Sequence, residues 1–137
     1  MMKKKFVITA CVLVLGILTI VLLNIFGTKP FSRLSASEIV SAELFIVPPD
    51  STVTLTNKED IAELTDILNE IIIYQEDNSG REYAGQLVQA TITLKKGETH
   101  TIGAYNPFLF LNGKCYRTKY EPCQKLNAFG NRILNEQ

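Results

Sequence analysis

The side chains that can act as nucleophiles or general bases are few in this sequence. His100 is the only histidine among the 137 residues, so any Ser–His or Cys–His catalytic pair would have to use it. It lies between Thr99 and Thr101 in an alternating stretch that is typical of a strand, and neither Gly-x-Ser-x-Gly nor a cysteine-protease motif accompanies it. The sequence therefore favours a packed side chain at a sheet surface over a catalytic histidine.

Two of the three cysteines, Cys115 and Cys123, lie in the last quarter of the chain. A disulfide between them would close a nine-residue loop and would stabilise the fold by about 2.6 kcal/mol in the chain-entropy model. It would require Cα atoms within about 7 Å of each other, so the bonded and the free state both stay open. Two thiols and one histidine are too few for a zinc site, and we expect no metal and no cofactor.

An acidic loop offers the one other catalytic pattern. Glu76, Asp77 and Glu82 surround Gly80, and two carboxylates flanking a sugar are the machinery of glycoside hydrolysis. Surface loops are commonly acidic because they are solvated, and this is the interpretation that the sequence favours. No catalytic residue is predicted.

Cations and aromatic residues gather near the C-terminus. Four cations fall between positions 114 and 125 with two tyrosines beside them: Lys114, Arg117, Lys119, Lys125, Tyr116 and Tyr120. Such a mixture formally suits a strand of nucleic acid, but the formal net charge of the chain is zero, which argues against nucleic-acid binding. We expect either scattered surface charges or a docking patch for an anionic surface such as lipid headgroups or wall polymers.

The nearby loop Tyr105-Asn106-Pro107-Phe108 supplies aromatic area that can anchor a protein partner. Phe108 and Phe110 fit a hydrophobic core equally well. The candidate partner-binding residues are thus Tyr105, Phe108, Lys114, Tyr116, Arg117 and Lys119.

An uncharged apolar stretch near the N-terminus determines where these residues are presented. It begins at Phe6 and ends at Phe26, and a helix of 21 residues spans about 31 Å, close to the hydrocarbon thickness of a bilayer. Lysines at positions 3, 4 and 5 precede it, whereas only Lys29 and Arg33 follow closely. This asymmetry predicts a single-pass anchor in the cell membrane with a cytoplasmic N-terminus and an extracytoplasmic C-terminal domain.

Two kinds of processing are alternatives to this anchor. A cleaved signal peptide has the same basic start, and the nearest small-residue site is around Ser35-Ala36-Ser37, but its apolar region is usually about 7–15 residues long. Ile8-Thr9-Ala10-Cys11 resembles a lipobox, yet the long apolar stretch follows it instead of preceding it. The sequence favours the uncleaved anchor.

The remaining chain divides into a tether and one domain. We expect a cytoplasmic start at 1–5, an anchor at 6–26, a flexible tether at 27–37 and a folded domain at 38–137. A hydrophobic content of 46% with only 20% charged residues is too apolar for a disordered chain. About 100 residues suffice for one hydrophobic core.

Hydrophobic periodicity places the elements of that domain. Alternating or β-branched stretches predict strands at 39–47, 51–56, 71–74, 86–95, 99–105, 108–111 and 115–118. Apolar residues spaced by three and four predict one helix capped by Asn57 and another after Glu121. We expect an α+β fold in which an antiparallel β-meander carries two helices on one face.

The basic start, the apolar stretch and the final segment from Ile102 to Leu126 make the chain similar to a group of small Gram-positive proteins. These proteins join one N-terminal membrane segment to a single external α+β domain. The resemblance implies a location in the cell envelope and a fold class, but no activity. We therefore expect a non-enzymatic binding or accessory module that contacts a protein or envelope component near the membrane. The alternative is a small secreted hydrolase or inhibitor released by signal cleavage.

Overall fold

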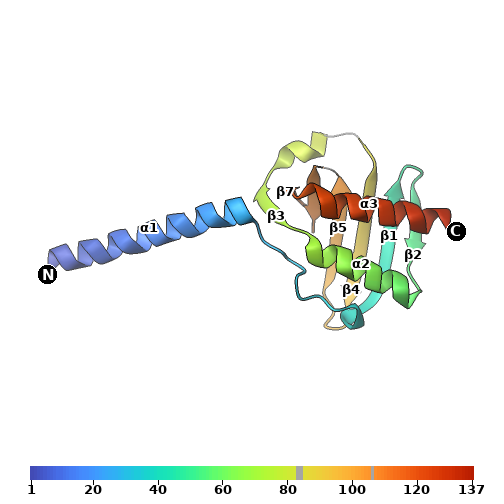
Figure 1. Ribbon diagram of the computed structural model, residues 1–137, viewed down its shortest axis with the longest axis horizontal. Coiled ribbons are helices and arrows are strands. Elements are labelled where there is room, and N and C mark those ends of the chain that lie inside the picture. The colour runs from blue at the N-terminus through green and yellow to red at the C-terminus, as the bar shows by residue number, and fades with distance from the viewer. Residues whose placement is uncertain (83–84, 106) are drawn as a thin grey trace.

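The computed structural model describes residues 1–82, 85–105 and 107–137. A long N-terminal helix projects from an α+β domain (Figure 1). Within the described residues the helices are α1 (Met2–Phe26), α2 (Lys58–Glu70) and α3 (Tyr120–Asn135), with short 3-10 turns η1 (Ala36–Glu38) and η2 (Asn78–Glu82). The strands are β1 (Ile39–Val47), β2 (Ser51–Thr54), β3 (Ile73–Glu76), β4 (Leu87–Leu94), β5 (Thr99–Tyr105), β6 (Phe108–Leu111) and β7 (Lys114–Thr118).

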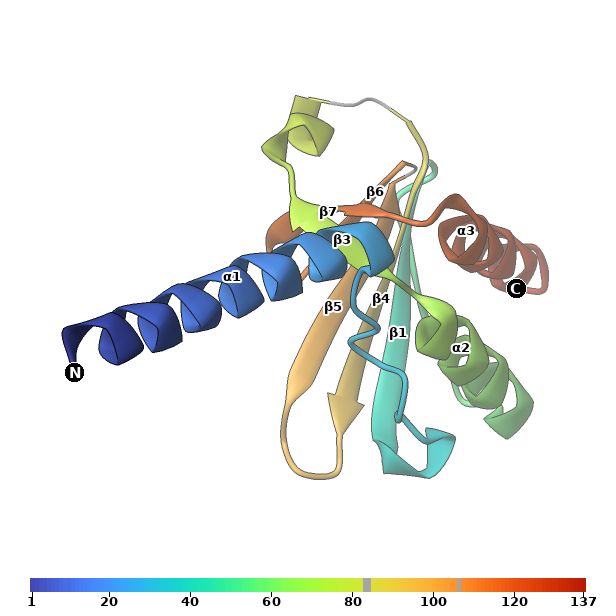
Figure 2. The ribbon, with the colours of Figure 1, turned by 60° about the vertical axis from the view of Figure 1, so that its left-hand side comes forward.

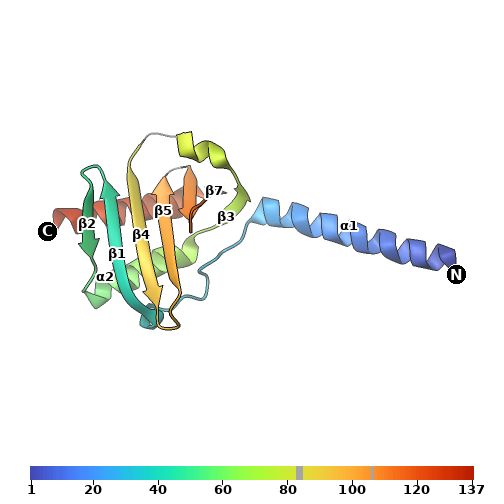
Figure 3. The same cartoon turned by 180° about the vertical axis from the view of Figure 1, so that it is seen from behind.

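The strands form one antiparallel sheet in the order β2-β1-β4-β5-β6-β7-β3, which Figure 3 shows from the side opposite the helices. The predicted α+β class is confirmed. The meander holds from β4 to β7, where each strand pairs with the next. The short strand β3 lies two residues later than predicted and pairs at the far edge with β7, a non-local pairing that periodicity does not encode.

Alternation along the central strands determines which face of the sheet is buried. Every second residue of β4, from Val88 to Leu94, is buried, and the register places buried residues of β1 and β5 beside them. Both α2 and α3 cover this face (Figure 1). The core between the sheet and these helices is mostly aliphatic, with Leu44, Ile46, Leu64, Leu68, Ile92, Ile102, Leu109 and Leu126 fully buried.

Local signals explain where the two domain helices begin. The side chain of Asn57 accepts a hydrogen bond from the Glu59 amide at 2.9 Å, as predicted for the cap of α2. Pro122 lies in the first turn of α3, where its missing N–H costs nothing. Ion pairs join the two helices, because Arg132 on α3 binds Asp60 of α2 at 3.0 Å and Glu63 of α2 at 2.7 Å.

The segment 27–37 differs from the flexible tether that its composition predicts. Thr28 and Ile73 exchange two backbone hydrogen bonds of 2.8 and 2.9 Å, so the chain pairs with β3 directly after α1. Phe31 is only 6% exposed and packs in the core. Asn69 of α2 donates hydrogen bonds to the carbonyls of Phe31 and Leu34. One buried aromatic residue therefore fixes a segment that otherwise looks like a linker.

The helix α1 is long and apolar enough to cross a membrane, by length and composition. None of its residues is buried against the domain, which distinguishes it from a core helix. It ends at Gly27, whose φ of +70° suits glycine. A Cβ there would lie 2.5 Å from Ile72 Cγ2 and 2.8 Å from the Ile73 carbonyl oxygen, so the exit of α1 packs tightly on β3 (Figure 2).

Candidate functional site

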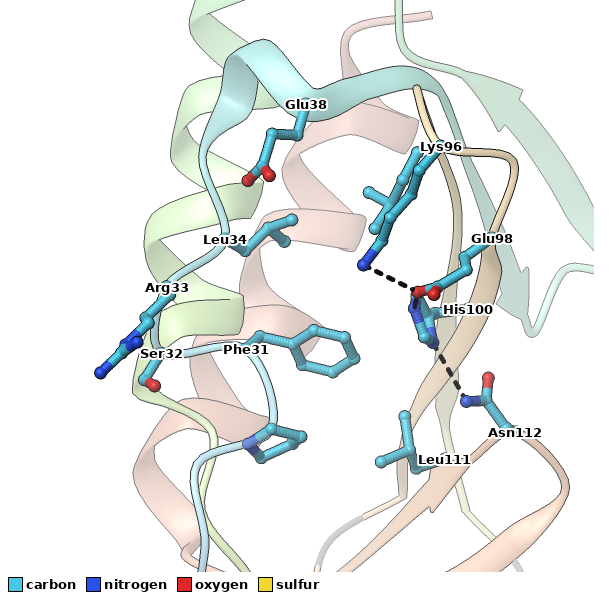
Figure 4. A pocket seen from close by; sticks show the side chains of 12 residues that line it. Phe31, Ser32, Arg33, Leu34, Glu38, Lys96, Glu98, His100, Leu111 and Asn112 are labelled. Carbon is cyan, nitrogen blue, oxygen red and sulfur yellow. Dashed lines mark hydrogen bonds and ion pairs between the residues drawn. The ribbon is translucent and has the colours of Figure 1, made fainter.

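His100 lines a cleft at one end of the sheet, which we call the His100 cleft. The segment 30–34 forms one wall, and the β4–β5 and β6–β7 turns form the other. Figure 4 shows Phe31 directed toward His100, while Ser32 and Arg33 point away from the cleft. The Phe31 and His100 rings meet edge to face with centroids 5.5 Å apart. The cleft thus exists because the predicted tether packs on the sheet.

Both ring nitrogens of His100 are engaged. The Asn112 amide accepts a hydrogen bond from the Thr101 backbone N–H through Oδ1 at 2.9 Å, which leaves its Nδ2 to donate to His100 Nδ1 at 3.1 Å. Nδ1 is then the acceptor, so the imidazole proton lies on Nε2, 3.3 Å from Glu98 Oε2. Lys96 also binds Glu98, and both contacts hold the pKa of that carboxyl below its ordinary value.

This arrangement fixes the imidazole and leaves no nitrogen available as a base. Ser32 is the one hydroxyl that lines the cleft, and its side chain points away in Figure 4. A nucleophile needs a base within hydrogen-bond reach, and this pair does not meet that requirement. The chemistry of the His100 cleft is that of a structural polar cluster.

The two domain cysteines are free thiols, which is one of the two states that the sequence left open. The sheet separates them. Cys115 points to the face covered by η2, where a Cβ built on Gly80 would lie 2.6 Å from its Sγ. Cys123 belongs to the core on the helix side, and its Sγ lies 3.9 Å from Thr118 Oγ1. Burial raises both thiol pKa values, that of Cys123 to about 11.

The carboxylates of the acidic loop have different surroundings. Asp77 accepts hydrogen bonds from the Ser79 hydroxyl at 2.6 Å and from the Arg117 guanidinium at 2.8 Å. These contacts lower the pKa of Asp77 to about 2. Glu76 and Glu82 are exposed. The loop is therefore a structural clip that fixes the start of η2 to β7.

The open face of the sheet carries a second hollow, of about 460 Å³, which we call the sheet-face hollow. It is lined by side chains that point away from α2 and α3: Val47, Leu87, Gln89, Thr101, Tyr105 and Phe110, with Gly80, Arg81, Gly85 and Gly113 at its rim. Because side chains alternate along strands, the same periodicity that buries Val88 and Ile102 aims their neighbours into this hollow.

Aromatic and cationic side chains contact one another in this hollow. The Tyr105 and Phe110 rings meet edge to face with centroids 5.9 Å apart. The Arg81 guanidinium carbon lies 5.7 Å from the centre of the Phe110 ring, and one of its nitrogens donates to the Gly113 carbonyl. The Tyr105 hydroxyl accepts a hydrogen bond from the Gly85 amide at 3.0 Å. An aromatic floor beside a cation is a surface that binds amphipathic groups.

The candidate partner-binding residues do not form a single patch. Tyr105 lines the sheet-face hollow. Phe108, for which the sequence left both a buried and a partner-binding role open, is 8% exposed and packs beneath Gly80. Tyr116 lies opposite Leu109, on the helix-covered face. Asn106, from the loop that the sequence predicts between Tyr105 and Phe108, lies outside the described residues.

The predicted basic residues are also dispersed. Arg117 is on the open face and is paired with Asp77. Lys114 and Lys119 are exposed at the two ends of β7. Sequence reasoning missed Arg81 and Leu87 as site residues. The alternation of Leu87 and Gln89 with the buried residues of β4 is the signal that would have revealed their face.

Comparisons with known proteins give no further guide to the site: no family model, no curated protein and no solved structure matches this chain. Among the described residues, no group of three or more histidine, cysteine and acidic side chains is placed to hold a metal ion. The geometry of the sheet-face hollow is therefore the observation on which a functional proposal can be based.

Proposed function

We propose that this protein is a non-enzymatic binding module, anchored in the cell membrane by α1, whose extracytoplasmic domain contacts a protein of the envelope through the sheet-face hollow. The observation that carries the proposal is the hollow itself. It offers aromatic and aliphatic surface beside a cation, on the sheet face opposite to α2 and α3.

The anchor and its orientation are supported by α1 and the charges that flank it. The helix has the length and apolarity of a membrane span, and three lysines precede its apolar part. The excess of positive charge at the N-terminal end favours a cytoplasmic N-terminus. The similarity to small Gram-positive proteins with one external domain supports a place in the cell envelope, as part of the same proposal.

The binding mode follows from the composition of the hollow. Phe110 and Leu87 offer a surface for an apolar or aromatic side chain of the partner, and Arg81 at the rim can donate to a carboxylate or a carbonyl. Buried aromatic residues ringed by polar groups typically carry most of the binding energy of protein interfaces. A segment of a neighbouring membrane protein, with an apolar residue next to an acidic one, fits this description.

The packed segment 27–37 limits where the partner can lie. Because Thr28 already pairs with β3, the domain starts at the membrane surface instead of on an extended leash. The sheet order contains six strand-to-strand steps from β3 to β2, or about 29 Å at the usual spacing. We expect the partner to be bound within roughly this height above the bilayer.

The test is a pulldown of the full-length protein from detergent-solubilised membranes, comparing Phe110→Ala with Phe45→Ala. Both phenylalanines lie on the open face of the sheet, but only Phe110 lines the hollow. Phe45 is 37% exposed on β1 and makes a matched control. We expect Phe110→Ala to lose the specific partner and Phe45→Ala to retain it, with both variants equally folded by near-ultraviolet circular dichroism.

Retention of the same partners by folded Phe110→Ala would remove the hollow from the proposal. Loss of partners by both variants would indicate that the wider sheet face, and not the hollow, is the binding surface. Phe108→Ala is unsuitable for this test because Phe108 is buried and its truncation would destabilise the domain.

A further inference from the structure

The exit of α1 brings together residues from three distant parts of the chain. Thr28 bridges one edge of β3, while Thr118 pairs with Ile73 on its other edge. The Lys119 amide donates to the Ile72 carbonyl at 3.3 Å. The backbones of Lys29 and Lys119, which follow Thr28 and Thr118, therefore lie on either side of the start of β3.

Two lysines at this exit form no ion pair with the described residues. Lys125 binds two carboxylates, Glu70 at 2.8 Å and Glu121 at 3.8 Å. Hydrogen bonding to Lys125, together with the charges of Lys29 and Lys119, holds the pKa of Glu70 below its ordinary value. Among the described residues, Lys29 and Lys119 form no ion pair of their own and are exposed.

Aromatic side chains accompany these lysines. Tyr120, the first residue of α3, is 58% exposed. Tyr74 of β3 is close enough to α1 that a Cβ on Gly27 would lie 3.0 Å from its ring. Tyrosine at the level of the headgroups and lysine just beyond a membrane helix are the usual composition of a membrane interface. Glu76 lies at the opposite end of β3, away from the exit.

From this juxtaposition we propose that Lys29, Tyr74, Lys119 and Tyr120 form a headgroup rim, a surface that seats the domain on the phosphates of anionic phospholipids around α1. The inference rests on the proposed membrane anchoring and concerns a surface separate from the sheet-face hollow. The ligand is a bilayer surface and not a free anion, because the aromatic members need an interface in which to bury their rings.

The test measures acetylation of individual lysines in the full-length protein. The protein is reconstituted into nanodiscs of phosphatidylcholine alone, or of phosphatidylcholine with one third phosphatidylglycerol, and treated with a soluble acetylating reagent before mass spectrometry. Lys58 and Lys95 serve as internal controls, because both are exposed and line a hollow beside η1, away from α1. We expect Lys29 and Lys119 to react about fivefold more slowly in the anionic discs, with the controls unchanged.

Charge reversal separates the rim from general electrostatics. Lys119→Glu should restore the reactivity of Lys29 in anionic discs, whereas Lys58→Glu, which changes the net charge equally, should leave the protection intact. High salt should also remove the protection, because it screens exposed charges.

Equal reactivity of Lys29 in both discs, or equal effects of the two charge reversals, would overturn the rim. Protection produced by inorganic phosphate in neutral discs would overturn it as well, since it would indicate a free-anion site. Failure of the anchor is a different result: the protein would not co-elute with the discs at all.

Discussion

The two faces of the sheet differ in what covers them. The helix-covered face carries an aliphatic core in which most side chains are fully buried. Among the described residues, η2 covers one end of the open face, and the rest of this face presents half-buried residues such as Gln89, Thr91 and Thr93. Because side chains alternate along each strand, neighbours in sequence belong to different regions. The helix-covered face therefore supplies most of the stability of the fold, whereas the open face keeps side chains in contact with solvent.

Two substitutions at adjacent positions of β1 should give the largest difference in stability between the two faces. Leu44→Ala removes a fully buried side chain and should lower the free energy of unfolding by about 3 kcal/mol. Phe45→Ala on the open face should change it by less than about 1 kcal/mol. Urea unfolding of the detergent-solubilised chain, followed by near-ultraviolet circular dichroism, measures both. Similar losses would contradict the division between the faces.

A smaller change in stability is expected at the end of the open face that η2 covers. A Cβ at Gly80 would lie 2.6 Å from both Cys115 Sγ and Phe108 Cγ, so Gly80→Ala should displace η2 at a cost of about 1–3 kcal/mol. The same displacement should expose the Cys115 thiol. Maleimide labelling of the native variant, compared with wild type, reports this exposure. Unchanged stability and labelling would mean that η2 does not seal this end.

How far the sequence could anticipate these faces depends on the range of the interactions. The period of two in 88–94 and the Asn57 cap are local signals, and both were confirmed. The edge position of β3 and the docking of Phe31 depend on contacts with residues distant in sequence. The sheet-face hollow requires η2 to fold over Phe110, which no periodicity in the loop indicates. The sequence therefore predicted the scaffold better than the site.

The pH dependence of stability tests the contacts by which Asp77 joins η2 to β7. The native pKa of Asp77 is about 2, below its ordinary value of 3.8. The ionised carboxylate therefore stabilises the folded state fully above about pH 5, and this stabilisation is lost as the pH falls through 2. Asp77→Asn should be less stable than wild type at neutral pH, and the difference should shrink as the pH falls from about 5 and vanish only below about pH 2. A difference that does not depend on pH would exclude the ionised carboxylate as its source.

The smallest expected effect is the absence of a response to reductant. Since Cys115 and Cys123 are free and lie on opposite sides of the sheet, a reducing agent should leave the melting temperature unchanged. Both thiols should react with a soluble maleimide only after unfolding. A lower melting temperature under reducing conditions would show that the two cysteines are bonded in the native protein.

Labelling of intact cells with a membrane-impermeant amine reagent tests whether α1 holds the domain on the outer side of the cell membrane. The exposed domain lysines Lys58 and Lys95 should be labelled in intact cells, and Lys3, Lys4 and Lys5 only after lysis, with the protein recovered in the membrane fraction. Labelling of the N-terminal lysines but not of the domain in intact cells, or recovery of the full-length protein in the soluble fraction, would contradict the account.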